Sequence, residues 1–347
     1  MKDHRRGGMP SPYPAAIPRR ILTITIAWVL FLLAVVLSPV AGLLAVVTDL
    51  VLRRRGWPTV RLVAFFVLAL WTEVSSHPVI LWTWVTQPVA RRTWTERNHG
   101  LMHWWCGRLV RGAQRVVGVR WDFDLPDDLG PGPLLAFSQH VSIVDAIAPV
   151  YILGNHQGWY LRYTLTRGLR FDPCLDIVGQ RIPNHFVARG TGDNTEELAT
   201  LRTLVTGMEA DECAAIFPGG GLYTPSGLAR AVTKLEERDS PQAAMAARFR
   251  HVMPPRPGGV NAFFDGSPQA NVVIVGHVGF EPLASLKKFW HVVPLREPVE
   301  VKVWRYERRE VPEDEEARMA WLYEKWLVMD DWIVDRLAAR SSEGVAA

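Results

Sequence analysis

The order of hydrophobic and polar positions divides the chain into two regions. Residues 21–48 form an apolar run without a charged residue, and a second apolar stretch covers residues 62–85, interrupted by Glu73, His77 and Pro78. A membrane-spanning helix needs roughly 20 apolar residues. The first run is long enough and lacks the small-residue cleavage pattern of a signal peptide. We therefore predict a membrane segment at residues 21–92, after a disordered basic N-terminus at residues 1–20. The competing interpretation, a pair of buried core helices, is disfavoured because such helices rarely lack a polar face over this length.

The path of this segment through the bilayer has two solutions. Arginines flank the apolar stretches at residues 19–20, 53–55 and 91–92. Positively charged loops prefer the cytoplasm, so two simple spans would put residues 53–55 on the wrong side. Two re-entrant hairpins, bent near Pro39 and near Pro78, would keep all these arginines cytoplasmic.

After Gly118 the pattern changes to short strands that alternate with helices. Strands are predicted at residues 119–123, 133–138, 158–163, 214–217, 272–277 and 299–306. Helices are predicted after Ser142, at residues 195–208 and 228–238, and in the last forty residues. This alternation predicts an α/β fold, a mixed sheet flanked by helices, within a domain at residues 93–347. In the last helix one apolar stripe recurs at three- and four-residue steps, and it either packs on the domain or forms a dimer face: Met319, Leu322, Trp326, Met329 and Ile333.

Composition adds limits on the partners. Hydrophobic residues make up 48% of the chain, charged residues 21%, and the formal net charge is +4. A basic, apolar protein suits an anionic membrane surface or phosphorylated substrates. We expect no nucleic-acid partner, because no basic tract or aromatic-basic repeat is present. The three cysteines lack metal-ligand spacing, so we also expect no metal. The oligomeric state is left open.

One segment combines residue types suited to acid-base chemistry. His140 and Asp145 follow the predicted strand at residues 133–138, where a turn leads into a helix. Five residues apart on a continuous helix they could not meet. With His140 in the turn and Asp145 in the first helical turn, the carboxylate can hold the imidazole in one tautomer and leave the other nitrogen as a base. The alternative is purely structural, since Ser142 and Asp145 also match a capping box.

Two downstream segments suit anionic groups. Gly219, Gly220 and Gly221 follow a buried strand that ends at Phe217, and such a turn can present backbone N–H groups to a phosphate or an oxyanion. Arg189 ends another apolar run and is either a phosphate contact or a solvated cation.

The order of these segments resembles the four sequence blocks of the 1-acyl-glycerol-3-phosphate acyltransferase (lysophospholipid acyltransferase) family. The blocks are residues 140–145, 186–189, 217–220 and 272–275. The insertion at residues 222–259 and the tail at residues 302–315 look most like the lysocardiolipin and lysophosphatidylinositol acyltransferase branch. The resemblance implies a glycerol-3-phosphate acyltransferase-like fold preceded by membrane helices. It also implies that His140 is the base, Asp145 its partner and Arg189 an acceptor-binding residue.

The third block departs from the family pattern. Gly219 stands where the family usually has glutamate, and Gly221 and Leu222 stand where it has threonine and arginine. Because the missing side chains normally help to hold the acceptor, we consider Arg256 in the insertion as a replacement phosphate contact.

The resemblance implies acyl transfer from acyl-CoA, a co-substrate, to a lysophospholipid hydroxyl, without a cofactor. We expect the enzyme in the cell membrane, with its catalytic domain on the cytoplasmic face. Two alternatives stay open: a CoA-independent phospholipid transacylase and a non-catalytic membrane lipid-binding protein.

Overall fold

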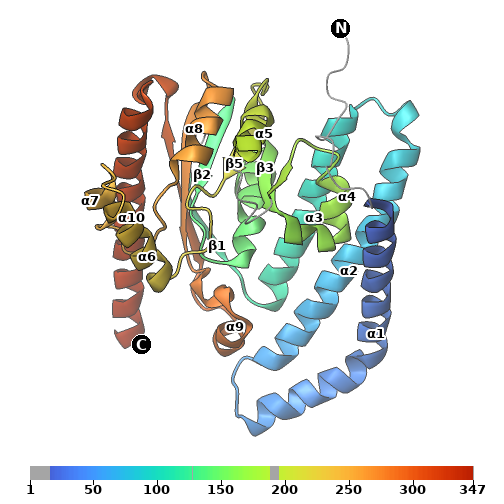
Figure 1. Cartoon of the computed structure of the whole chain (residues 1–347). Coiled ribbons are helices and arrows are strands. Elements are labelled where there is room, and N and C mark those ends of the chain that lie inside the picture. Colours follow the sequence, from blue (N-terminus) through green and yellow to red (C-terminus); the bar gives the residue numbers. More distant parts are fainter. Residues whose placement is uncertain (1–15, 127, 188–194, 347) are drawn as a thin grey trace. The chain divides into compact units, whose positions relative to one another are not determined.

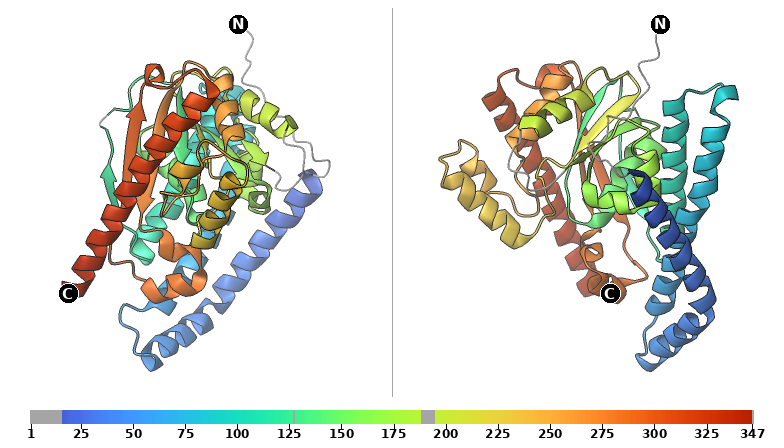
Figure 2. Two further views of the ribbon diagram at one scale, coloured as in Figure 1. Left: turned by 60° about the vertical axis from the view of Figure 1, so that its left-hand side comes forward. Right: turned by 45° about the vertical axis from the view of Figure 1, so that its right-hand side comes forward.

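The computed structural model describes residues 16–126, 128–187 and 195–346. The chain divides into two compact units, each assembled from segments far apart in the sequence (Figures 1 and 2). Unit 1 comprises Met1–Arg120, Val150–Gly190 and Ser285–Pro298. Unit 2 comprises Trp121–Pro149, Thr191–Ala284 and Val299–Ala347.

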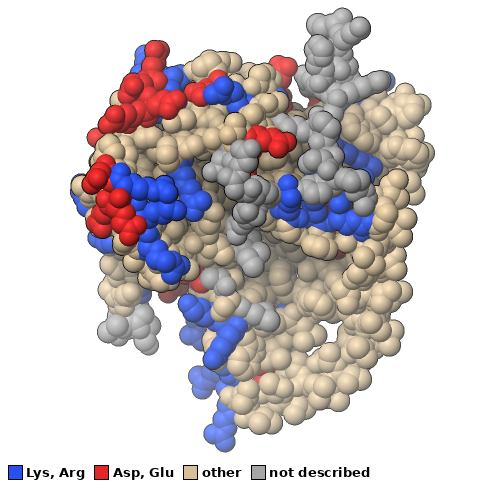
Figure 3. Space-filling model, viewed as in Figure 1, with Lys and Arg blue, Asp and Glu red and all other residues tan. Residues whose placement is uncertain are grey.

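Unit 1 begins with two long apolar helices, α1 (Ala16–Val51) and α2 (Pro58–Val85), which pack against each other. Both are long and apolar enough to cross a membrane, and their surface in Figure 3 is largely free of charge. Pro39 and Pro78 lie inside these helices and end neither of them. Both helices thus continue through these prolines, and α1 bends along its length (Figures 1 and 2). The predicted basic N-terminus lies outside the described residues at 1–15, whereas residues 16–20 belong to α1.

The remaining elements of unit 1 are mostly short. After η1 (Gln87–Val89), α3 (Trp94–Val116) packs against α2, and Gly112 permits a close approach, because a Cβ there would lie 2.2 Å from Leu68 Cδ2. A π-helical segment (Val150–His156), β3 (Tyr160–Thr166), η4 (Arg167–Phe171), α4 (Pro173–Val178), β4 (His185–Val187) and α9 (Leu286–Val292) follow. Strands β3 and β4 pair in parallel. The sequence pattern did not predict β4, α4 or α9, which are only three to seven residues long.

Polar contacts within unit 1 hold both ends of the α1–α2 hairpin. At the start of α1, Arg19 and Arg20 donate to the buried Asp176 carboxylate, at 2.8 and 3.1 Å. At the tip, Arg54 donates to the Trp290 carbonyl oxygen at 3.0 Å, and its guanidinium lies 4.4 Å from the centre of the Trp290 ring. One side of the α1–α2 hairpin therefore packs on the rest of unit 1, and its opposite side is exposed.

Unit 2 is built on a mixed sheet. Its strands are β1 (Trp121–Asp124), β2 (Leu134–Ser138), β5 (Glu212–Ile216), β6 (Asn271–Val278) and β7 (Val299–Tyr306), in the spatial order β1-β7-β6-β2-β5. β2 runs parallel to both β5 and β6, and β6 is antiparallel to β7. β2 and β5 are buried over their whole length, as expected for strands at the centre of a covered sheet. The predicted α/β fold with a mixed sheet is thus confirmed.

Unit 2 also contains the helices α5 (Thr195–Val205), α6 (Pro225–Glu236), α7 (Ala243–Ala246), α8 (Pro257–Gly266) and α10 (Glu315–Ala346), with short 3₁₀ turns η2 (Ile143–Ala146), η5 (Glu281–Ala284) and η6 (Arg308–Glu310). Helix α5 packs against α8, whereas α6 and α7 contact each other and α7 contacts α10. α10 packs along β6, and the predicted stripe from Met319 to Ile333 is buried in unit 2. The stripe therefore packs on its own domain.

Candidate active site

Three parallel strands of unit 2 end at the same edge of the sheet. β2 leads to His140, β5 leads to the Phe217 turn, and β6 carries His277 near its end. Because β2 pairs in parallel with both neighbours, their carboxyl ends lie side by side. This edge is where open α/β sheets generally bind their ligands.

His140 and Asp145 are in contact at this edge. The His140 Nδ1 atom lies 3.1 Å from Asp145 Oδ2. The imidazole is 14% exposed, whereas the carboxylate is buried. Asp145 therefore occupies Nδ1 and leaves Nε2 as the nitrogen that can accept a proton from a substrate.

The segment after Ser142 is shorter and tighter than the predicted helix. It is the 3₁₀ turn η2, in which the same Asp145 Oδ2 also accepts the backbone N–H groups of Val141 at 2.5 Å and Ser142 at 2.8 Å. One carboxylate oxygen thus holds both the turn and the imidazole. These contacts complete the predicted capping box of Ser142 and Asp145 and place the same carboxylate against the imidazole.

The His140 ring also rests against Phe217. The two rings are stacked, with centroids 4.1 Å apart and planes inclined by 10°. The chain after Phe217 returns to the histidine, because the Tyr223 N–H donates to the His140 carbonyl oxygen at 2.6 Å. These contacts fix the ring plane and place the glycine turn beside the histidine.

The glycine turn is closed by backbone contacts. The Gly220 N–H donates to the Phe217 carbonyl oxygen at 3.0 Å, so this N–H is already used. Among the described residues no acceptor is seen for the N–H groups of Gly219 and Gly221. These two groups, rather than all three, are the donors that the turn can offer to an anion.

Gly219 has no room for a side chain. A Cβ at this position would lie 2.6 Å from Met253 Cβ, far inside van der Waals contact. The segment that carries Met253 therefore occupies the space that a glutamate side chain at position 219 would need.

Arg256 lies against the same turn. A Cβ on Gly220 would be 2.9 Å from the Arg256 guanidinium carbon, and the Arg256 N–H donates to the Pro218 carbonyl oxygen at 2.9 Å. Its side chain is exposed, and no ion pair joins it to a carboxylate in the described part of the chain. Arg256 thus presents a positive charge at the glycine turn.

Helix α10 holds the segment that ends at Arg256. Trp326 donates to the Met253 carbonyl oxygen at 3.0 Å, and Tyr323 donates to the Pro255 carbonyl oxygen at 2.9 Å. Burial raises the pKa of Tyr323, which keeps its hydroxyl protonated as a donor. The buried Asp330 carboxylate accepts the N–H groups of Arg250 and His251 at 2.8 and 2.7 Å. Burial raises the pKa of Asp330 as well.

A second histidine faces the carboxylate and was not predicted from the sequence. His277 Nε2 lies 3.5 Å from Asp145 Oδ1, and the side chain is 1% exposed. Gln139, also buried, donates to the His277 carbonyl oxygen at 2.5 Å. The parallel neighbourhood of β2 and β6 brings these residues together, and no local sequence motif could reveal that neighbourhood.

The structure brings together six of the predicted site residues in unit 2: His140, Asp145, Gly219, Gly220, Gly221 and Arg256. Arg189 lies outside the described residues, so its predicted role stays a prediction.

Comparisons with known proteins show the fold of this arrangement. No family model and no curated protein matches the sequence. Among solved structures, the chain is similar to the 1-acyl-sn-glycerophosphate acyltransferase PlsC from Thermotoga maritima, with a TM-score of 0.51 and 11% sequence identity. The similarity covers 80% of this chain and 98% of that structure. The protein therefore has the fold of that acyltransferase.

Proposed function

We propose that this protein is an O-acyltransferase that moves a fatty acyl group from acyl-CoA to a hydroxyl of a lysophospholipid, 1-acylglycerol-3-phosphate or a related acceptor, in phospholipid synthesis or remodelling. The observation that carries the proposal is the 3.1 Å contact between His140 Nδ1 and Asp145 Oδ2 at the strand edge. The fold shared with a solved acyltransferase supports it. Of the family's branches, the insertion and tail favour the lysocardiolipin and lysophosphatidylinositol acyltransferases.

His140 Nε2 is the base in this reaction. It takes the proton from the acceptor hydroxyl while that oxygen attacks the thioester carbonyl of acyl-CoA, and the carboxylate of Asp145 stabilises the imidazolium that forms. The tetrahedral intermediate then collapses, the carbon–sulfur bond breaks, and the imidazolium returns the proton to the leaving CoA sulfur. Acyl ester and free CoA are the products.

The glycine turn and Arg256 supply positive charge and N–H donors for the negative groups of the substrate and of the intermediate. The N–H groups of Gly219 and Gly221 are the donors available to an oxyanion or a phosphate oxygen, and preorganised donors of this kind stabilise developing negative charge. Arg256 binds the acceptor phosphate in place of the family's missing side chains. Arg189 is proposed as a further acceptor contact, from the sequence block alone.

Membrane attachment fits an insoluble acceptor, which can diffuse laterally to the site. We propose that the exposed apolar side of α1 and α2 enters the bilayer, with the catalytic unit on the cytoplasmic face. The polar contacts at both hairpin ends, Arg20 with Asp176 and Arg54 with Trp290, support attachment from one side. Two simple spans would place these ends on opposite faces of the membrane.

The test is a donor and acceptor panel with the purified full-length protein in detergent. Labelled acyl-CoA is supplied with lysophosphatidate, lysophosphatidylinositol, monolysocardiolipin or a neutral acceptor, and both CoA release and esterified lipid are measured. We expect CoA release to match ester formation with a phosphate-bearing acceptor.

Two other outcomes decide against this proposal. Acyl exchange from a labelled diacyl phospholipid, with no use of acyl-CoA, would identify a transacylase. Complete inactivity toward all donors, together with lipid binding, would identify a non-catalytic lipid-binding protein.

A further inference from the structure

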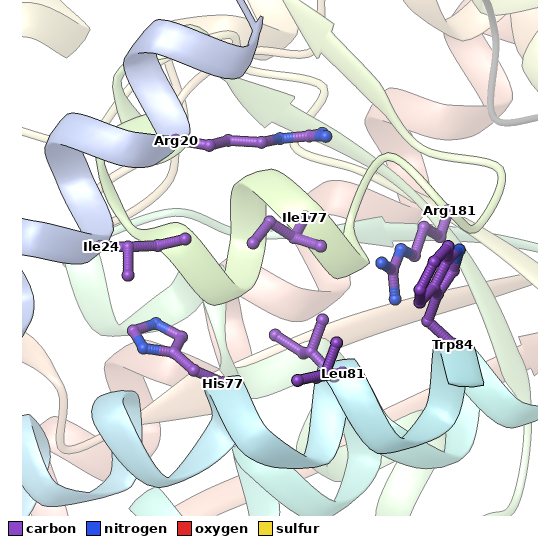
Figure 4. Close-up of a pocket in the computed structure, with 8 residues that line it drawn as sticks. Arg20, Ile24, His77, Leu81, Trp84, Ile177 and Arg181 are labelled. Carbon is purple, nitrogen blue, oxygen red and sulfur yellow. The ribbon is translucent and has the colours of Figure 1, made fainter. Parts of the chain in front are cut away.

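A pocket of about 300 Å³ lies in unit 1, between α1, α2 and the segment that starts with α4 (Figure 4). Its walls are apolar, with Ile24 from α1, Ile80 and Leu81 from α2, and Ile177 from α4. Two cations also line it, Arg20 from α1 and Arg181 from the residues after α4. In Figure 4 these two arginines enter from different sides, with Ile177 between them. An apolar pocket with two cations suits an amphiphilic anion.

The Arg181 guanidinium has a hydrogen-bond donor that lacks an acceptor among the described residues. Its Nη1 atom is buried and has no hydrogen-bond partner among the described residues. The guanidinium lies 4.9 Å from the centre of the Trp94 ring, a contact that uses its face and leaves N–H groups in its plane free. A buried donor without an acceptor is costly, so an anionic ligand would stabilise this position.

The local charge balance also favours an anion. Arg19 and Arg20 share the carboxylate of Asp176, and Arg181 forms no ion pair with a carboxylate in the described ranges. Burial, and then the charge of Arg20, lower the pKa of Arg181 to about 10. Arg181 is therefore still a cation at neutral pH. The carboxylate of Asp176 pairs with Arg19 and Arg20, and that of Glu73 lies 3.3 Å from the lining His77, so neither pairs with Arg181.

We propose that this pocket binds one membrane phospholipid, with its phosphate at Arg181 and an acyl chain along Ile24, Ile80 and Leu81. A bilayer lipid is favoured over a soluble anion because the pocket opens onto an apolar surface. Leu81 and Trp84, at its rim, are 59% and 60% exposed, and tryptophan is enriched at headgroup depth. The lining residues all belong to unit 1, which contains none of the predicted catalytic residues. The site therefore serves attachment and does not depend on acyl transfer.

The experiment is native mass spectrometry of the delipidated full-length protein in neutral detergent. It is titrated with dioctanoyl phosphatidic acid, which has phosphate and chains, with inorganic phosphate, and with dioctanoylglycerol. The key variant is Arg181→Gln. Its matched control is Arg92→Gln, an exposed arginine of the same unit that does not line the pocket. Ile24→Phe, which fills the apolar part, is a second variant in case Arg181→Gln does not fold.

We expect the phosphatidic acid to bind at least about tenfold more weakly to Arg181→Gln and to Ile24→Phe than to the wild type, as for loss of a charge-assisted contact. Arg92→Gln and His140→Ala should bind as the wild type does, and the two partial ligands should bind far more weakly. Unchanged binding to Arg181→Gln, or equal losses in Arg181→Gln and Arg92→Gln, would overturn the proposal. Equally tight binding of inorganic phosphate would show a free-anion site instead. Because activity is not the readout, an inactive protein could still pass this test.

Discussion

A single carboxylate oxygen carries two tasks at the centre of the site. Asp145 Oδ2 accepts from His140 Nδ1 and from the N–H groups of Val141 and Ser142. An asparagine can keep all three contacts with its amide oxygen in this position, but it cannot supply the negative charge that stabilises an imidazolium. Charge and geometry are therefore separable at this residue.

Asp145→Asn should lower the acyl-transfer rate about 100-fold or more, the range for loss of acid-base assistance, without loss of stability. Asp145→Ala should also lower the free energy of unfolding, by about 1–3 kcal/mol, because the turn's donors lose their acceptor. Steady-state kinetics and denaturant unfolding of both variants check this. Equal stability of the two variants would contradict the structural task.

The glycine turn allows a comparison of two neighbouring glycines. Gly219→Ala puts a Cβ 2.6 Å from Met253 Cβ, whereas a Cβ at Gly221 meets nothing within 4 Å. Gly219→Ala should therefore destabilise the protein by about 1–3 kcal/mol, as overpacking does, and Gly221→Ala should be close to neutral. Thermal unfolding measures both. A tolerated Gly219→Glu, with wild-type stability, would show that the packing of Met253 does not exclude a glutamate at this position.

Sequence reasoning identified some site residues and missed others for a physical reason. His140 and Asp145 are five residues apart, so local turn geometry alone can predict their contact. His277 and Gln139 meet through the pairing of β2 with β6, more than a hundred residues apart. Their sequence neighbourhoods carry no sign of this pairing.

At the scale of elements, α10 fixes a segment that has little regular structure of its own. Asp330 accepts two backbone N–H groups, and Trp326 and Tyr323 bind two carbonyl oxygens of the segment that ends at Arg256. The helix thereby determines where Arg256 stands relative to the glycine turn.

Asp330→Asn should lower the free energy of unfolding by about 1–3 kcal/mol, because an amide offers one oxygen to two N–H donors. It should also raise the KM for the acceptor, as Arg256 loses its support. The control is Asp331→Asn, since Asp331 forms an exposed pair with Arg250, and such pairs contribute little. An equal loss in the free energy of unfolding for Asp331→Asn and Asp330→Asn would contradict this role of Asp330.

Helices with strong amphipathic periodicity were predictable, and short elements were not. The apolar stripe of α10 predicts which face of the helix is buried, and Met319 and Trp326 of this stripe are buried in the structure. The turn after Ser142 was predicted as a helix, but the contacts of Asp145 tighten it into a 3₁₀ turn. Those contacts depend on three-dimensional neighbours that helical propensity does not include.

At the scale of the whole molecule, the exposed apolar side of the α1–α2 hairpin is the surface that we propose enters the bilayer. Leu33 and Leu37 of α1 lie one helical turn apart and are 50% and 54% exposed. An aspartate at the centre of a bilayer costs about 2.5–3.5 kcal/mol on insertion scales. The double variant Leu33→Asp, Leu37→Asp should therefore shift much of the protein from carbonate-washed membranes to the supernatant. Leu33→Ala with Leu37→Ala should stay in the pellet, and a pelleted aspartate variant would refute this role.

The sequence predicted the two apolar helices but not their contacts with the rest of unit 1. Composition identifies α1 and α2 as lipid-compatible, whereas the contacts of Arg54 with Trp290 join residues more than two hundred positions apart. Those contacts depend on the fold of unit 1, and the number of arginines in the loops carries no sign of them.

The most direct measurement is the rate of acyl transfer from acyl-CoA to the best lysophospholipid acceptor by His140→Ala, compared with wild type and with His291→Ala. His291 is an exposed histidine of unit 1 and serves as the control. The proposed mechanism predicts that His140→Ala loses at least about 100-fold in kcat while its unfolding temperature and membrane attachment are unchanged, and that His291→Ala matches the wild type. A folded His140→Ala protein that transfers acyl groups at the wild-type rate would contradict it.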